Sequence, residues 1–230
     1  MNLKYIYHSS FLLEMEESVF IFDYFKGEIP EFDRSKRLYV FSTHAHGDHF
    51  SKKIFEKFGS HKKVKFILSD DIEYENNNGY DITYVSPNKQ YSIDNLLIET
   101  LKSTDEGIAI IINSEGKTVY HSGDLNWWTW VGFESEEEYN AMTKAFKEEI
   151  EKIKGRHFHL AMMVLDYRQK ERYDWGLKYL LENTKIDYVA PMHCWDKFEV
   201  IENFKKDNKD VIGETVIIYT DKIGEQGYNL

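Results

Sequence analysis

Cysteine and proline are scarce in this sequence, and each scarcity limits what the protein can be. Cys194 is the only cysteine, so no disulfide can form within the chain. A chain without disulfides fits a reducing compartment, and we expect a cytoplasmic protein. The prolines, Pro30, Pro87 and Pro191, stand far apart, so no proline-rich linker divides the sequence. We therefore expect one domain over residues 1–230, a length that can bury a substantial core.

Long apolar runs and clusters of positive charge are also missing. No apolar stretch approaches the roughly 20 residues that a helix needs to cross a bilayer, and the N-terminal residues do not resemble a signal peptide. Acidic residues number 40 against 29 basic ones, which gives a formal net charge of -11. Nucleic-acid binding generally needs a basic stripe that releases counterions. We therefore expect a small-molecule substrate, with no nucleic-acid or membrane partner, and the sequence carries no signal for an oligomeric state.

One stretch concentrates metal-binding side chains: three histidines and an aspartate lie within His44-Ala45-His46-Gly47-Asp48-His49. The run before it, residues 38–41, is β-forming, so the stretch falls on a loop that leaves a strand. Alternate residues of an extended segment point the same way, so the first two histidines can bind one cation. A turn at the glycine would direct the aspartate and the third histidine toward a second cation. The spacing predicts a two-metal site; the alternative is a polar turn that is rich in histidine.

This loop resembles the His-x-His-x-Asp-His signature of the metallo-β-lactamase superfamily of metal-dependent hydrolases, and the resemblance covers nearly the whole chain. Residues 5–14 and 19–23 look like the opening hairpin of that family, which makes Asp23 a support residue for the ligand loop. Asp124 follows a later apolar strand and matches the aspartate that bridges the two metals. His193 ends another apolar strand and matches the last ligand of the second metal.

The resemblance implies a ligand set and also shows that one ligand is missing. The implied metal ligands are His44, His46, Asp48, His49, Asp124 and His193, with Asp124 shared between two metals. The family supplies a further histidine to the first metal from the segment that matches residues 101–107, which contains none here. Asp105 either completes this site through an oxygen, which favours a harder ion such as manganese, or is a turn residue before Gly107. We expect zinc, as one or two ions, with manganese as the alternative.

Strand-like and helical patterns alternate along the chain. Strands are predicted near residues 3–7, 11–15, 18–23, 38–42 and 64–68, with a short helix near 51–59 and a surface turn at 75–79. A second half is expected to begin near Tyr80, with strands near 82–85, 96–101, 107–113, 117–121, 160–165 and 187–191. The most clearly indicated helix begins at Ser135, which forms a capping box with Glu138. This order suits an α+β fold, and the resemblance implies the four-layer αββα sandwich of the metallo-β-lactamase type.

Tryptophans and an arginine are the candidates for a substrate wall. Trp127, Trp128 and Trp130 follow the expected bridging aspartate. They either line a pocket for an apolar or sugar-like group, with Trp128 or Trp130 the more exposed, or pack against the next helix. Arg168 follows another strand and either binds an anionic group or forms a surface salt bridge. Strand alternation turns Cys194 away from the metal, so it is interpreted as a buried bystander.

The expected chemistry follows from the ligands. The resemblance implies a hydrolase of the lactonase-like branch, in which metal-bound hydroxide attacks an ester, lactone or phosphodiester bond. Asp48 would orient the water and accept its proton, and is the candidate catalytic residue. No Gly-x-Ser-x-Gly motif offers a metal-free route. The alternative is a non-hydrolytic sensor or binding protein that holds one metal on the same fold. His8 and His121 are interpreted as packed or supporting histidines rather than ligands.

Overall fold

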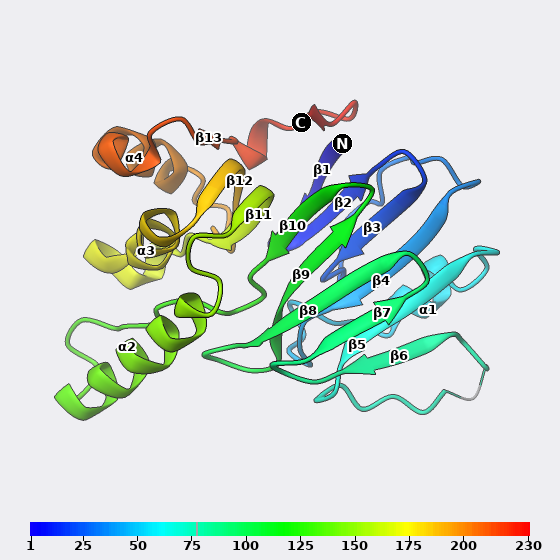
Figure 1. Cartoon of the computed structure of the whole chain (residues 1–230), viewed down its shortest axis with the longest axis horizontal. Helices are drawn as coiled ribbons and strands as arrows, with labels where there is room; N and C mark the ends of the chain where they lie inside the picture. Colours follow the sequence, from blue (N-terminus) through cyan, green and yellow to red (C-terminus); the bar gives the residue numbers. More distant parts are fainter. Residues whose placement is uncertain (77) are drawn as a thin grey trace.

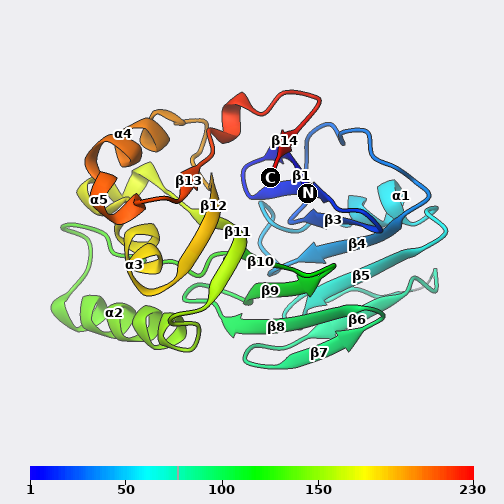
Figure 2. The same ribbon diagram turned by 45° about the horizontal axis from the view of Figure 1, so that its top comes forward.

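The computed structural model describes residues 1–76 and 78–230, and its strands form two seven-stranded sheets (Figures 1 and 2). The first sheet runs in the order β14 (Tyr228–Asn229), β1 (Asn2–Tyr7), β2 (Ser10–Glu14), β3 (Ser18–Phe22), β4 (Arg37–Ser42), β5 (Val64–Ser69) and β6 (Ile82–Val85). The second runs in the order β13 (Val216–Ile217), β12 (Lys185–Met192), β11 (His157–Val164), β10 (Lys117–His121), β9 (Ile108–Ser114), β8 (Leu96–Lys102) and β7 (Gln90–Ile93).

Helices cover the outer faces of both sheets. The short helix α1 (Lys53–Phe58) packs on the first sheet. The second sheet is covered by α2 (Glu136–Glu151), α3 (Trp175–Asn183) and α4 (Glu199–Asp207), with α5 (Lys209–Ile212) beside them (Figure 2). Two 3-10 helices, η1 (Tyr167–Arg172) and η2 (Thr220–Lys222), complete the elements. The result is a four-layer αββα sandwich, which confirms the predicted α+β class and architecture.

Alternation along the central strands explains the layers. On β3, Phe20 and Phe22 join the core between the two sheets, whereas Val19 and Ile21 join the core beneath α1. Both sets are fully buried. A strand that is buried on both faces reads as a continuous apolar run, and this is why the central strands were the easiest elements to predict.

Helix α2 begins where the sequence indicates. The Ser135 side chain accepts a hydrogen bond from the backbone N–H of Glu138, and the Glu138 side chain binds back to the Ser135 backbone. Phe146 and Ile150 are fully buried against the second sheet. The capping box and the apolar stripe therefore fix this helix from local sequence alone.

The predicted division of the chain near Tyr80 is wrong. Strand β6 pairs in parallel with β5, so it belongs to the first sheet, and the second sheet starts only at β7. The sequence also gave no signal for β7, β13 and β14, because β7 is a half-exposed edge strand and the other two contain two residues each. The predicted turn at 75–79 includes Asn77, which lies outside the described residues.

The topology brings several strand ends to one edge. Strands β3 and β4 run in parallel, and so do β10, β11 and β12. Carboxyl ends of parallel strands meet at the same edge of a sheet, which is where α/β sheets bind ligands. The segments that follow these strands contain most of the predicted site residues. Among the described residues, no helix is both long enough and apolar enough to cross a membrane.

Candidate metal centre

Two clusters of possible metal ligands lie side by side at this edge. In one, donor atoms of His44, His46 and Asp124 lie within 4.8 Å of one another. In the other, donor atoms of His8, Asp48, His49 and His193 lie within the same distance. The structure thus brings together all six residues that were predicted as ligands, and it adds His8.

Asp124 joins the two clusters through its two carboxylate oxygens. Its Oδ2 lies 3.7 Å from Nε2 of His44, which belongs to the first cluster. Its Oδ1 lies 3.2 Å from Nε2 of His49 and 3.6 Å from Nε2 of His193, both of the second cluster. One carboxylate therefore faces both clusters, as a bridging ligand would.

These separations fit a cation between the donors. Two ligands that each lie about 2.05 Å from a tetrahedral ion are about 3.3 Å apart. The buried Nε2 atoms of His8, His44 and His49 and the Oδ1 atom of Asp124 have no hydrogen-bond partner in the described structure. Buried polar atoms rarely lack a partner. Four such atoms beside one another are explained by a divalent ion, so the residues present fit a metal.

Asp23 sets the direction of two histidine rings. Its Oδ2 lies 2.7 Å from Nδ1 of His49 and accepts a hydrogen bond of 2.7 Å from the Thr43 hydroxyl. Nδ1 of His44 lies 3.1 Å from that hydroxyl oxygen. Because the carboxylate only accepts and the hydroxyl proton is already donated, both Nδ1 atoms carry protons, and the Nε2 atoms are left as the positions that can bind a metal. The predicted support role of Asp23 thus has a geometric basis.

Asp166 does the same for His193. Its Oδ2 lies 2.9 Å from Nδ1 of His193, and the carboxylate also accepts from Nε and the backbone N–H of Arg168. The sequence analysis singled out Arg168 in this segment and missed Asp166. The signal was available in the topology: β11 and β12 are parallel neighbours with Val164 opposite Met192, so the residues after them meet.

The centre has a strong electrostatic polarity. Burial alone would lower the pKa of His49, but the carboxylates of Asp124 and Asp23 outweigh it and raise that pKa well above its usual value. Burial would raise the pKa of Asp124, whereas His49 and His193 hold it well below its usual range. The same field that holds a proton here attracts a metal cation. Burial also lowers the pKa of His44 to about 4, which keeps its ring neutral and able to bind metal.

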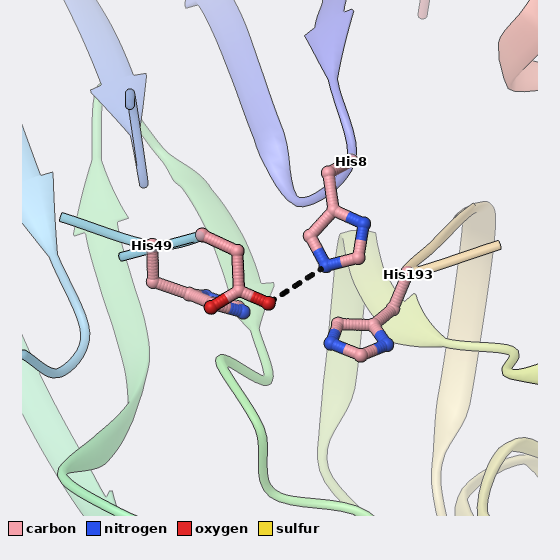
Figure 3. Close-up of side chains that lie close together, drawn as sticks. His8, His49 and His193 are labelled. Atoms are coloured by element: carbon pink, nitrogen blue, oxygen red, sulfur yellow. Dashed lines mark ion pairs between the residues drawn. The ribbon is translucent and has the colours of Figure 1, made fainter. Parts of the chain in front are cut away.

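His8 is the residue whose role the sequence did not indicate. It lies in the turn between β1 and β2 with φ 56°, a conformation that is unusual for a histidine. Its Nε2 lies 3.6 Å from Oδ2 of Asp48, and its ring centroid lies 4.1 Å from that of His193. Figure 3 shows His8, His49 and His193 close together, with an ion pair of His8 drawn as a dashed line. The sequence indicated a packed or supporting role for His8, whereas its unpartnered Nε2 lies with the donor atoms of the second cluster.

The segment 103–107, which matches the part of the family that supplies a further histidine, lies directly against the ligand loop. Oδ2 of Asp105 lies 3.6 Å from Nδ1 of His46, and Oε2 of Glu106 lies 3.3 Å from its Nε2. A Cβ atom at Gly107 would stand 2.0 Å from the Thr43 carbonyl oxygen, so only glycine fits there. Asp105 is thus near His46 but is not a member of either ligand cluster.

A cavity of about 330 Å³ opens beside the centre. Its lining includes four members of the clusters, His46, Asp48, Asp124 and His193, together with Asp105, Trp128, Trp130, Arg168 and Trp195. Trp127 instead packs among Phe146, Trp175 and Tyr179 beneath α2. Trp128 and Trp130 therefore line the cavity, whereas Trp127 packs against the helix, so each of the two predicted alternatives holds for part of the group.

His121 and Cys194, which the sequence did not indicate as ligands, lie outside both ligand clusters. Nε2 of His121 lies 3.0 Å from the Ser9 carbonyl oxygen, and its Nδ1 accepts from the Gly123 N–H, so both nitrogens are engaged. Cys194 is buried outside both clusters, and burial raises the pKa of its thiol. Both findings agree with the sequence-based interpretation.

Comparison with known proteins places the chain in a family. The family model described as the beta-lactamase superfamily domain matches residues 2–129, more than half of the chain. The protein belongs to the metallo-β-lactamase superfamily, as its signature loop predicted. A search of curated proteins finds no significant match.

Solved structures share the fold at low sequence identity. Igni18, a metallo hydrolase from Ignicoccus hospitalis, is 18% identical, with a TM-score of 0.62 over 100% of this chain and 97% of that one. YhfI from Bacillus subtilis, a metallo-beta-lactamase fold protein, is 15% identical, with a TM-score of 0.62 over 99% and 96%. CmlA, a diiron beta-hydroxylase from Streptomyces venezuelae, is 11% identical, with a TM-score of 0.58 over 94% of this chain and 52% of CmlA.

Proposed function

We propose that the protein is a metal-dependent hydrolase of small organic molecules that cleaves an ester, lactone or phosphodiester bond. The observation that carries this proposal is the arrangement around Asp124, where two ligand clusters meet at the two oxygens of one carboxylate beside an open cavity. Family membership and the name of Igni18 as a metallo hydrolase support it.

The two clusters would hold the metal. His44, His46 and Asp124 would hold one ion, and His8, Asp48, His49, His193 and the shared Asp124 would hold the other. Divalent ions bound there would activate water as a nucleophile and polarise the bond that is hydrolysed. Zinc suits the nitrogen-rich donor sets, and manganese or iron suits the additional carboxylates.

Asp48 is the residue suited to handle the proton of the attacking water. Its side chain lines the cavity and is 32% exposed, so substrate and water can reach it. A carboxylate in this position orients the water and accepts its proton. Asp23 and Asp166 hold the histidine rings from behind, so the donor atoms keep their directions while substrate binds.

Elemental analysis and turnover together test the proposal. Metal would be measured in protein purified without added metal or chelator and again after addition of zinc, manganese or iron. A panel of esters, lactones and phosphodiesters would then be assayed on wild type, on Asp48→Asn and on a control, Asp210→Asn, which alters an exposed aspartate on α5. We expect bound metal and a loss of turnover of at least about 100-fold in Asp48→Asn alone.

One observation favours the alternative of a single-metal sensor or binding protein. The first cluster has only three members, and its His46 side chain is 44% exposed and lies close to Glu106. A chain that keeps one ion after metal supplementation and turns over none of the panel would be such a protein. That result would reject the hydrolase.

A further inference from the structure

The cavity beside the metal centre has one positively charged wall residue. Among the described residues that line it, Arg168 is the sole lysine or arginine, and the same lining includes the carboxylates of Asp48, Asp105 and Asp124. The chain as a whole carries a formal charge of -11, so its general field repels anions. The positive charge of Arg168 in this cavity therefore suggests a local role in binding an anion.

Arg168 is held in position by a buried carboxylate. Its Nε lies 2.9 Å from both oxygens of Asp166, which is itself fully buried. Its Cζ lies 4.6 Å from the centroid of Trp195, a cation–π contact on a second side. The side chain is still 40% exposed, and within the described structure its Nη1 donates to no residue. The guanidinium is thus fixed before binding, with one donor edge free, which lowers the entropy lost on binding an anion.

An aromatic surface lies beside this arginine. Trp128 and Trp130 stack with ring centroids 5.8 Å apart and an interplanar angle of 7°. Nε1 of Trp128 donates to the backbone carbonyl of Asp124 at 2.8 Å, which ties the surface to the metal centre. Such a flat wall suits a planar or apolar group.

We propose that the substrate is a small organic anion with a flat or apolar body. Its carboxylate or phosphate would bind the Arg168 guanidinium, its body would contact Trp128 and Trp130, and its hydrolysable bond would lie at Asp48 and Asp124. The cavity of about 330 Å³ is small for a ligand site, which limits the size of this molecule. This inference rests on the proposed hydrolase function, because it assigns the substrate of the same site.

Quenching of tryptophan fluorescence tests the subsite without measuring activity. Metal-loaded protein would be titrated with 4-nitrobenzoate, with 4-nitrophenylphosphonate and with neutral 4-nitrobenzamide. We expect at least one of the anions to bind about tenfold more tightly than the amide, the value of one charge-assisted hydrogen bond. Arg168→Gln should remove this preference. Arg172→Gln should keep it, because Arg172 lies in the same helix η1 but pairs with Glu134 away from the cavity lining.

Two results would overturn the subsite. An anion preference that persists in Arg168→Gln would show that Arg168 does not bind the anion. A loss of metal from Arg168→Gln, measured by elemental analysis, would show that Arg168 acts only by positioning Asp166 and, through it, His193. Failure of the hydrolase proposal would look different. Wild-type protein would then turn over no substrate of the panel, and yet its Arg168-dependent preference for anions would remain and support the subsite.

Discussion

Oδ2 of Asp23 lies 2.7 Å from Nδ1 of His49, and both side chains are completely buried. The same carboxylate accepts from the backbone and hydroxyl of Thr43, which in turn orients His44. One aspartate from the end of β3 therefore controls two histidines from the loop after β4.

Replacing this carboxylate should weaken metal binding without unfolding the protein. Asp23→Asn should lower metal affinity about 10- to 100-fold, because the amide lacks the charge that holds the Nδ1 protons. Asp23 has φ 44°, which asparagine tolerates, so the substitution adds no backbone strain. Titration against a competing chelator measures the affinity. Asp94→Asn is the matched control, since Asp94 also has a positive φ, of 51°, but lies outside both ligand clusters. Equal affinities in all three proteins would contradict the assignment.

Gly107 should tolerate no side chain. A Cβ there would stand 2.0 Å from the Thr43 carbonyl oxygen and 2.6 Å from Cβ of His44, at φ +68°. Gly116 has a similar φ of +72° with open space around it. Gly116→Ala should cost about 1 kcal/mol of unfolding free energy through backbone strain alone. Gly107→Ala should cost about 2 kcal/mol more, because the loop must also move. Denaturant unfolding of the two variants gives the difference, and similar costs would refute the close contact.

His8 should contribute to metal binding at the second cluster. His8→Phe keeps an aromatic ring beside His193 and Trp195 but removes the unpartnered Nε2. We expect at least about tenfold weaker binding of one ion, measured by cobalt(II) titration and the visible absorption of the bound ion. His61→Phe provides the control, because His61 is also buried but lies outside the clusters. Unchanged cobalt binding and absorption in His8→Phe would leave His8 with a packing role only.

The two clusters should bind metal with different affinities. The second offers four donors and a share of Asp124, whereas the first offers His44, His46 and the other oxygen of Asp124. Zinc titration should therefore show two steps. His193→Ala should remove the tighter step, and His46→Ala the weaker one. Asp105→Asn distinguishes the two interpretations of Asp105: a change in the weaker step indicates an oxygen ligand, and no change indicates a turn residue.

The sequence alone determined the parts of this protein that depend on local pattern. The hexapeptide from His44 to His49 indicated the family, and the capping box at Ser135 marked the start of α2. The central strands could be predicted because a strand that is buried on both faces appears in the sequence as a continuous apolar run. These features depend on residues that are near one another in the chain.

Only the tertiary structure decided which distant residues meet. It placed β6 in the first sheet, directed His8 at the second cluster, and set Asp166 behind His193. It also separated Trp127, which packs in the core, from Trp128 and Trp130, which line the cavity. These outcomes depend on strand order, on register and on a left-handed turn at His8. Each is fixed by packing across the two sheets, which no local pattern encodes.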